Sequence, residues 1–433
     1  MEADVRADGE GAALRDTIYA LSSGAPPAGV AIIRISGPGA GDALTALARR
    51  LPEPRAAAFR KLRVDGEPLD NSVILWLPGP RSATGEDVAE LHLHGGRAVI
   101  ARALAALGAM PGLREALPGE FTRRSFENGA LDLSEAEGLG DLLMAETEGQ
   151  RRAALALMGG GLSRQVVAWQ ERLLALAARV EAALDFSDED EVAPLPADFG
   201  GRLAALRDDM ETALARPGAE RLKDGVRVVI AGPPNAGKSS LLNALVGRDA
   251  AIVTELPGTT RDLVEAPVAI GGIPFLLTDT AGLRDTADRV ETIGVERARA
   301  SLASADIILW LGGRGEAPDK AVRIHAKADL GPAATPADLA TSVVTGEGLD
   351  ALILLLQARA AELLPVPGEV ALNARHREAI ALAAEALADA EAVDLIVAAE
   401  ALRTARAALD RVTGKAGVED MLDALFGRFC IGK

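Results

Sequence analysis

The chain has 433 residues, of which 49 % are hydrophobic and 25 % charged, so it can build the cores of two to four domains. Its net charge of −17 disfavours direct, large-area nucleic-acid binding, which needs clustered Lys and Arg. The single cysteine, Cys430, excludes an intramolecular disulfide and a Cys-based zinc site, and it fits a reducing cytosol. With a polar N-terminus and no apolar run long enough to span a membrane, we expect a cytoplasmic protein.

In chain order, residues 1–15 read as a disordered extension, and short β-type runs with turns then predict an α+β domain over 16–128. Long apolar-periodic runs predict helices over 129–220. Strands and helices alternate over 221–365, which indicates an α/β domain with a parallel sheet, and helical texture returns over 366–433. The simplest architecture is a multidomain α/β protein whose helical domain is discontinuous and carries the α/β domain as an insertion.

The strongest local pattern is G-x-x-x-x-G-K-S, from Gly232 to Ser239. A β-rich run, 226–230, precedes it and a helical run follows, which is the context of a phosphate-binding loop rather than a chance glycine turn. Lys238 would reach the β- and γ-phosphates, and Ser239 would hold Mg²⁺. The helix after the loop presents its positive end to the anion.

Further nucleotide motifs follow in order. Asp279 ends a predicted strand and would lie on the far side of Mg²⁺, while the Gly282 amide would meet a γ-phosphate. A threonine within 257–262 could close over Mg²⁺ as a switch. Asp329 would pair with the guanine N1–H and exocyclic amine, which favours GTP, and 342–346 would be the last base-contacting loop.

Several positions depart from the usual pattern. Ala326 stands where the guanine motif normally begins with Asn, so we expect weaker nucleotide affinity with guanine selectivity retained. Only residues 312–320 separate two predicted parallel strands, which indicates a missing or vestigial helix. Leu283 replaces the Gln that orients water in Ras-like enzymes. Glu291 is the candidate for that task, although a solvated helix residue is the alternative.

The chain resembles the MnmE (TrmE) family of tRNA-modification GTPases over nearly its whole length. The matching segments are spread over every domain and comprise 16–18, 29–37, 85–88, 94–96, 118–122, the phosphate-binding loop with Asn235, 258–262 and the C-terminal 429–433. The resemblance implies an N-terminal α+β folate-binding-type domain, a discontinuous helical domain and an inserted Ras-like P-loop GTPase domain.

The resemblance also implies a mechanism, in which a K⁺ ion at the phosphate-binding loop replaces an arginine finger and two GTPase domains dimerise across it. The implied K⁺ positions are Asn235, Thr254, Thr259 and the carbonyl of Leu256, and the implied Mg²⁺ ligands are Ser239 and Thr260. Glu291 becomes the catalytic glutamate, acting with Lys238 and Thr260. Motifs and resemblance together place GTP contacts at Asn235, Ala236, Gly237, Lys238, Ser239, Ser240, Thr254, Glu255, Leu256, Pro257, Gly258, Thr259, Thr260, Asp279, Thr280, Ala281, Gly282, Lys327, Asp329, Ser342, Val343 and Val344.

For the N-terminal domain, the resemblance implies 5-formyltetrahydrofolate or a related folate bound by Arg34, Glu90 and Lys433, while Ala130 stands where the family often has Lys. Cys430 is linked by the resemblance to the modification step, whereas a lone cysteine by itself is usually a buried small apolar residue. The implied assembly is a homodimer that forms a heterotetramer or larger complex with the FAD-dependent partner MnmG (GidA). Together they would add an aminomethyl or carboxymethylaminomethyl group to C5 of the wobble uridine, position 34, of certain tRNAs.

Three alternatives stay open. A GTP-controlled RNA or ribosome assembly factor would carry a basic RNA-binding module, and the sequence contains none. A folate-dependent one-carbon enzyme with a regulatory GTPase domain is the second, and a GTPase of degenerate activity is the third. The four histidines, His92, His94, His325 and His376, are too dispersed to indicate a metal site, so we expect structural roles for them.

Overall fold

The computed structural model describes residues 16–185, 195–249, 265–280, 299–313, 317–333, 335–390, 394–415, 422, 425–427 and 429–432. The extension predicted over 1–15 lies outside these residues. By its internal contacts, the chain divides into two compact units. Unit 1 comprises Met1–Ala136 and Gly414–Lys433, and unit 2 comprises Glu137–Thr413. The domain boundaries expected from the sequence stay a prediction.

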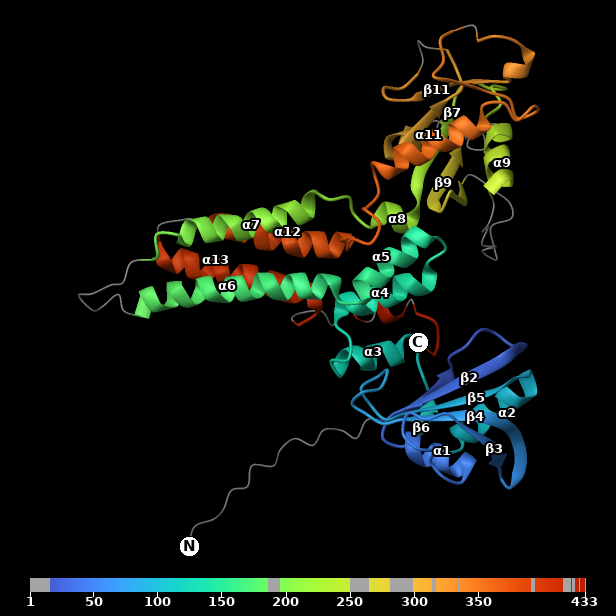
Figure 1. The fold of residues 1–433 in the computed structure, drawn as a ribbon, viewed down its shortest axis with the longest axis vertical. Helices are drawn as coiled ribbons and strands as arrows, with labels where there is room; N and C mark the ends of the chain where they lie inside the picture. The colour runs from blue at the N-terminus through green and yellow to red at the C-terminus, as the bar shows by residue number, and fades with distance from the viewer. Residues whose placement is uncertain are drawn as a thin grey trace, which may run out of the picture. The chain divides into compact units, whose positions relative to one another are not determined.

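Unit 1 is built on a six-stranded sheet in the order β3-β4-β5-β2-β1-β6 (Figure 1). Neighbouring strands are antiparallel except β1 and β6, which are parallel. The strands are β1 (Thr17–Leu21), β2 (Ala28–Ser36), β3 (Ala58–Val64), β4 (Glu67–Leu77), β5 (Val88–Gly95) and β6 (Leu113–Glu115). This sheet confirms the α+β architecture predicted for the N-terminal region.

The two faces of this sheet carry different side chains, because successive residues of a strand point to opposite faces. One face carries Ile33 and Ile35 of β2 and forms a core with α1 (Ala40–Ala48) and α2 (Arg97–Gly108). The other face carries Arg34 of β2 beside Ile18 and Ala20 of β1, and Phe121 of α3 (Glu120–Glu127) packs against that pair. The second face thus combines an apolar cluster with a charged strand residue.

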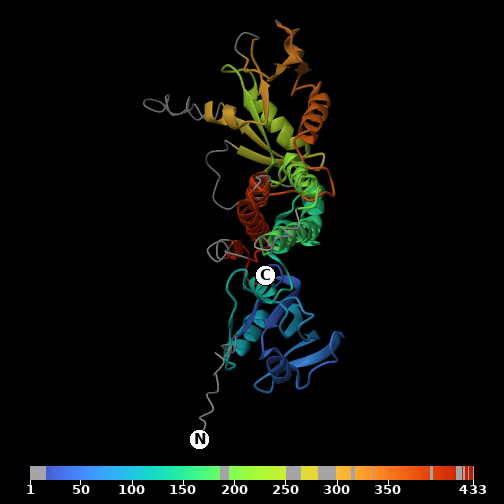
Figure 2. The same cartoon turned by 90° about the vertical axis from the view of Figure 1, so that its left-hand side faces the viewer.

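The helical part of unit 2 is made from two separated segments of the chain. Its helices are α4 (Leu133–Met144), α5 (Glu148–Met158), α6 (Gly161–Asp185), α7 (Phe199–Ala215), α12 (Ala374–Asp389) and α13 (Leu395–Thr413). Figures 1 and 2 show α6 beside α13 and α7 beside α12. Trp169 of α6, Met210 of α7, Ile380 of α12 and Leu409 of α13 share one core. The discontinuous helical domain is therefore confirmed.

The segment between the two helical parts forms a second six-stranded sheet, in the order β12-β11-β10-β7-β9-β8. Its strands are β7 (Val226–Ala231), β8 (Glu265–Ile270), β9 (Ile273–Asp279), β10 (Ile307–Trp310), β11 (Val322–Ala326) and β12 (Leu339–Thr341). The short helix α8 (Glu220–Asp224) leads into β7. Helices α9 (Lys238–Asp249) and α11 (Leu349–Ala361) pack on the sheet face that carries Val226, Val228 and Ile230. The alternation of strands and helices predicted this α/β arrangement.

One strand of this sheet departs from the expected parallel arrangement, and one connection between strands is as short as expected. Strand β8 is antiparallel to β9, because Gly271 and Gly272, both with positive φ, join the two strands in a two-residue hairpin. Strands β10 and β11 are parallel although only residues 311–321 connect them. The described parts of that connection, 311–313 and 317–321, contain no helix, as the short spacing predicts.

Candidate nucleotide-binding site

The phosphate-binding loop joins the end of β7 to the start of α9, and its backbone adopts left-handed angles at three positions. Gly232 has φ 147°, Asn235 has φ 62° and Gly237 has φ 99°. A Cβ at Gly232 would lie 2.8 Å from the carbonyl oxygen of Leu311, the residue after β10, so only glycine fits at this point. The loop therefore has the tight, glycine-dependent path that aims backbone N–H groups at an anion.

Lys238 begins α9 and is buried, with 6 % of its surface exposed. Its Nζ donates to the carbonyl oxygens of Gly232, at 3.1 Å, and Pro233, at 2.9 Å. The ammonium group is thus held directly over the loop, where two carbonyl dipoles compensate its burial. Phosphate oxygens, which are stronger acceptors, can compete for the same N–H groups.

Two oxygen-bearing side chains meet beside the loop, one from the helix and one from the neighbouring strand. The Ser239 hydroxyl donates to Oδ2 of Asp279, which is buried at the end of β9. The next residue, Thr280, donates its hydroxyl to the carbonyl of Ile230 at 3.1 Å and so ties the end of β9 to β7. A hydroxyl and a carboxylate in contact form a hard oxygen pair of the kind that Mg²⁺ prefers.

A second group of contacts lies at the ends of β11 and β12. Lys327 Nζ donates to the carbonyl oxygen of Asn235 at 2.8 Å, so the predicted base-binding segment is tied to the phosphate-binding loop. Ser342 is fully buried, and its hydroxyl donates to Oδ1 of Asp329 at 2.5 Å. The same Ser342 oxygen accepts from the N–H groups of Val344 and Thr345, both at 3.2 Å. The Asp329 carboxylate is therefore oriented by the loop predicted to contact the base.

The structure brings together one part of the predicted nucleotide site. Asn235, Ala236, Gly237, Lys238, Ser239, Ser240, Asp279, Thr280, Lys327, Asp329, Ser342, Val343 and Val344 lie on the loop, the first turn of α9, and the ends of β9, β11 and β12. The other predicted residues lie outside the described residues: Thr254, Glu255, Leu256, Pro257, Gly258, Thr259, Thr260, Ala281, Gly282 and Glu291. The nucleotide-binding roles predicted for both groups of residues stay predictions.

A second candidate site lies on the sheet of unit 1. Arg34 of β2 and Glu90 of β5 are cross-strand partners, and Arg34 Nε and Nη2 both donate to Glu90 Oε1 at 3.0 Å. The guanidinium carbon of Arg34 lies 5.8 Å from the centre of the Phe121 ring. The two predicted folate-contacting residues are thus in direct contact, while Lys433 lies outside the described residues.

Cys430 is exposed, so the interpretation of this residue as a buried apolar side chain is wrong. Among the described residues of the C-terminal segment, Phe426 and Phe429 are buried, whereas Cys430 and its neighbour Ile431 are exposed. The exposed thiol is accessible to reagents and substrates, which the proposed role in modification requires.

Sequence reasoning missed a buried charge network in unit 1. Arg124 is 5 % exposed and donates to Asp16, Glu86 and Glu120. Arg114 also donates to Asp16 and Glu120. Burial alone would raise the pKa of Glu120, but the hydrogen bonds and charges of Arg114 and Arg124 hold it below its ordinary value. Asp16, Glu86 and Glu120 lie in the segments that resemble the MnmE family, so the resemblance could have indicated these three carboxylates. Nothing in the sequence pattern indicated Arg114 or Arg124.

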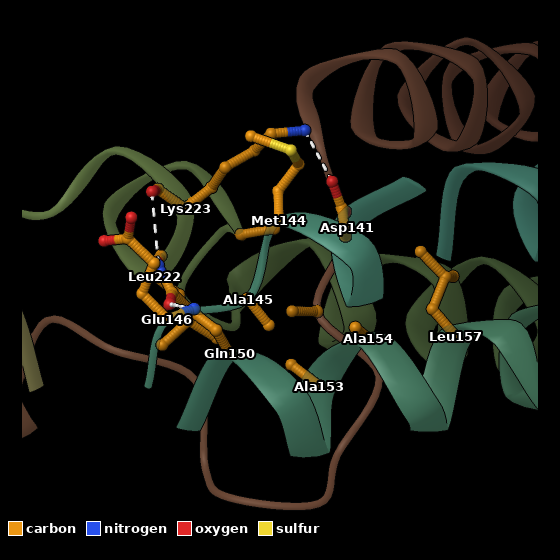
Figure 3. Close-up of a pocket in the computed structure, with 12 residues that line it drawn as sticks. Asp141, Met144, Ala145, Glu146, Gln150, Ala153, Ala154, Leu157, Leu222 and Lys223 are labelled. Carbon is orange, nitrogen blue, oxygen red and sulfur yellow. Dashed lines mark hydrogen bonds and ion pairs between the residues drawn. The ribbon is translucent and has the colours of Figure 1, made fainter. Parts of the chain in front are cut away.

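Another cavity, of about 320 Å³, lies between α4, α5 and α8 and has a mostly apolar lining that includes Ala153, Leu157 and Leu222 (Figure 3). Lys223 and Asp141 form an ion pair at 2.5 Å on its rim. No predicted site residue lines this cavity. Within the described parts of the chain, no group of three or more His, Cys, Asp or Glu side chains could hold a metal ion, and no helix is long and apolar enough to cross a membrane.

Comparison with known proteins gives two family matches that together span most of the chain. Residues 17–130 match the GTP-binding protein TrmE N-terminus, and residues 133–430 match the MnmE helical domain. A relative from Rhizorhabdus wittichii named tRNA modification GTPase MnmE is 61 % identical over 430 residues, covering 98 % of each chain. A relative of the same name from Erythrobacter litoralis is 58 % identical over 96 % of this chain and 100 % of its own.

Among solved structures, the chain is similar to the G domain of the T. maritima FeoB iron transporter, at 27 % identity over 31 % of this chain and 98 % of that one. The TM-score of 0.23 is too low to support any conclusion about this chain.

A strand, a glycine-dependent loop and a helix that places Lys238 and Ser239 beside Asp279 define a P-loop nucleotide-binding protein. Ser342 orients the carboxylate of Asp329, the residue predicted to contact the base. The protein is a GTP-binding GTPase. The chain belongs to the MnmE family of tRNA modification GTPases.

Proposed function

We propose that the chain couples K⁺-stimulated GTP hydrolysis to the modification of C5 of the wobble uridine, position 34, in certain tRNAs. The group added is an aminomethyl or carboxymethylaminomethyl group, and the work is shared with the FAD-dependent partner MnmG (GidA). The observation that carries this proposal is the pairing of an oriented nucleotide scaffold with a relative at 61 % identity that is named a tRNA modification GTPase.

GTP would be bound at both its phosphates and its base. The N–H groups of the loop and of the first turn of α9 would surround the phosphates at the positive end of the helix. Lys238 would exchange the carbonyls of Gly232 and Pro233 for phosphate oxygens. Asp329, held by Ser342, would accept from the guanine N1–H and exocyclic amine, and adenine lacks that donor pair.

The residues fit the two expected ions to different extents. Ser239 and Thr260 would hold Mg²⁺, and Asp279, whose carboxylate accepts from the Ser239 hydroxyl, would lie on the far side of the ion. Asn235, with Thr254, Thr259 and the carbonyl of Leu256, would hold K⁺ beside the phosphates, where a cation stabilises the charge of the transition state. Glu291 would orient the attacking water, because Leu283 cannot.

The pair Arg34–Glu90 fits a folate at the unit 1 site. A pterin ring is flat and presents adjacent N–H donors along one edge, which a carboxylate accepts, while Phe121 offers an aromatic face nearby. The folate would supply the one-carbon unit of the modification. Lys433 would add a cation to the site, and Cys430 would act in the modification step from its exposed position.

The proposed assembly is a cytoplasmic homodimer that binds MnmG. The net charge of −17 fits this arrangement, because the partner would then supply much of the basic surface that holds the tRNA. A folate-dependent one-carbon enzyme with a regulatory GTPase domain is a second candidate, and the Arg34–Glu90 geometry favours it equally. Folate binding without partner-dependent tRNA modification would select that second candidate.

The first test is steady-state GTP hydrolysis by the full chain in KCl and in NaCl at equal ionic strength. We expect strong stimulation by K⁺, which Asn235→Ala lowers about 100-fold and Glu291→Ala abolishes. Glu265→Ala, at an exposed position of β8, is the matched control and keeps the wild-type rates. Equal, slow turnover in both salts would overturn the K⁺ mechanism and favour a GTPase of degenerate activity.

A further inference from the structure

The carboxylate of Glu90 is held at both of its oxygens. Arg34 Nε and Nη2 donate to Oε1, each at 3.0 Å, and His92 Nε2 lies 3.1 Å from Oε2. Glu90 and His92 lie two residues apart on β5, so both side chains point to the sheet face that Arg34 shares from β2. A carboxylate paired with arginine only accepts hydrogen bonds, so His92 is the donor.

These contacts fill most of the acceptor capacity of Glu90. A carboxylate offers about four lone-pair sites. Among the described residues, Arg34 directs two N–H groups at Oε1 and His92 directs one at Oε2. One site, on Oε2, is left for the N–H group of a ligand. His92 therefore decides which acceptor remains available, and by holding the second oxygen it prevents the carboxylate from turning about its own axis.

The three side chains are partly buried. The Glu90 side chain is 13 % exposed, Arg34 23 % and His92 26 %, so all three can reach a ligand yet are largely shielded from water. Hydrogen bonds in such a place are stronger than at an open surface, and loss of their geometry costs correspondingly more.

We propose that His92 is a positioning residue of the unit 1 site, which orients the Glu90 carboxylate toward the N–H edge of a pterin-type ligand. This inference rests on the folate part of the proposed function. His92 acts through Glu90, so it sets the affinity for the ligand and takes no part in GTP hydrolysis. Without His92, Arg34 would hold Glu90 at Oε1 alone, and a ligand would also have to fix the position of Oε2, which corresponds to a loss of roughly 3- to 10-fold in affinity.

The test is calorimetric titration of the full chain with 5-formyltetrahydrofolate in three variants. His92→Leu removes the donor and should weaken binding by roughly 3- to 10-fold. His92→Gln places an amide N–H near the same point and should restore affinity to within about 2-fold. His94→Gln is the matched control, because His94 lies on the same strand but contacts Asp70, at 2.8 Å, and it should bind as wild type.

Two results would overturn the proposal: wild-type affinity in His92→Leu, or equal losses in the Leu and Gln variants, which would assign the effect to the bulk of the ring. Should His92→Leu fail to fold, His92→Thr replaces it, since threonine suits a strand and is too short to reach Oε2.

A second measurement without ligand separates this inference from the folate assignment. In [¹⁵N]arginine NMR spectra, the Arg34 Nε–H should exchange with water more slowly in wild type and His92→Gln than in His92→Leu. If the wild-type chain binds no folate but this order of exchange holds, the folate function fails while the positioning of Glu90 stands. If the exchange rates are equal in all three proteins, His92 does not position the pair.

Discussion

At the scale of single residues, Ala326 is the departure with the clearest geometric consequence. It ends β11 next to the phosphate-binding loop, and a Cβ added at Gly237 would lie 3.8 Å from the Ala326 methyl group. An asparagine amide at this position could therefore reach the loop and brace it. Alanine cannot form such a brace. Among the described residues, the hydrogen bond from Lys327 Nζ to the Asn235 carbonyl links the predicted base-binding segment to the loop.

We expect Ala326→Asn to tighten GTP binding by about 5-fold, because one net hydrogen bond contributes about 1 kcal/mol. Titration with a fluorescent GTP analogue measures this change. The control is Ala328→Asn, since Ala328 lies on the adjoining 3₁₀ turn but is not near Gly237. Unchanged affinity in Ala326→Asn would show that the loop needs no further brace.

The sequence predicted those site residues whose neighbours along the chain define their role. Lys238 and Ser239 begin the helix after the phosphate-binding loop, and Asp279 ends a strand further along the chain. This fixed order of motifs and elements was enough to find them. Arg124 and His92 could not be found in this way. Arg124 contacts Glu86, which lies 38 residues away in the chain, and His92 contacts Glu90 because alternate residues of β5 share one face of the sheet. A lone Arg or His in a sequence does not indicate which carboxylate it will meet in the fold.

At the scale of elements, Gln150 joins two helices through one amide. Its Oε1 accepts from the N–H of Thr147 at 2.8 Å and completes the capping box of α5. Its Nε2 donates to the carbonyl of Leu222 in α8 at 3.0 Å (Figure 3). Helix α8 leads directly into β7 and the phosphate-binding loop, so Gln150 links the helical part to the strand that carries the loop.

Gln150→Glu separates these two roles. A carboxylate still accepts from the Thr147 N–H, so α5 remains capped, but it cannot donate to Leu222 and would lie against a carbonyl oxygen. We expect destabilisation by about 1–3 kcal/mol, with faster amide hydrogen exchange in α8 and unchanged exchange in α5. Faster exchange in α5 alone would show that the amide serves only the cap.

A second connection between elements is the buried carboxylate of Glu137 on α4. Arg375 of α12 donates to both of its oxygens at 2.8 Å, and His376 Nε2 lies 2.8 Å from Oε2. Arg375 also donates to the carbonyls of Arg411 and Val412 near the end of α13, so one arginine joins three helices. Burial alone would raise the pKa of Glu137, but the contacts with His376 and Arg375 lower it to about 2.

The lowered pKa predicts a loss of stability in acid. Because the folded pKa of about 2 lies below the ordinary 4.5, the stabilisation is complete above pH 4.5 and is lost as pH falls toward 2. The shift corresponds to about 3 kcal/mol. Urea denaturation should therefore show Glu137→Gln less stable than wild type by about that amount at pH 7, and the gap should close toward pH 2. A gap that does not change with pH would assign the loss to geometry rather than to charge.

At the scale of the whole molecule, the chain returns at its end to the unit in which it began. Pro118 and Ile431 form a β-bridge, and the rings of Phe126 and Phe426 lie 6.4 Å apart. Gly119 also packs tightly here, since a Cβ on it would lie 2.3 Å from the carbonyl of Phe426. Helical texture predicted the helices of residues 366–413, but periodicity carries no information about where a short terminal segment binds, so these contacts could not be predicted from the sequence.

Gly432 is the residue on which this return depends. It has φ 94°, and an added Cβ would lie 2.2 Å from the carbonyl oxygen of Leu21 at the end of β1. Leu21 follows Ala20, the cross-strand partner of Arg34, so the terminus lies beside the strand that neighbours the candidate folate site. Gly432→Ala must therefore displace Gly432 from this strand.

We expect Gly432→Ala to weaken binding of 5-formyltetrahydrofolate about 10-fold or more, since a hydrogen bond to a charged group contributes about 1.5–3 kcal/mol. GTP turnover by the same protein should not change, because the nucleotide site lies in unit 2. Gly66→Ala is the control: Gly66 has a φ of 84° and no atom within 4 Å of an added Cβ, so it introduces backbone strain without a collision. Wild-type folate affinity in Gly432→Ala would show that the terminal lysine contributes nothing to the site, while equal losses in both variants would trace the effect to strain in unit 1 rather than to the position of the terminus.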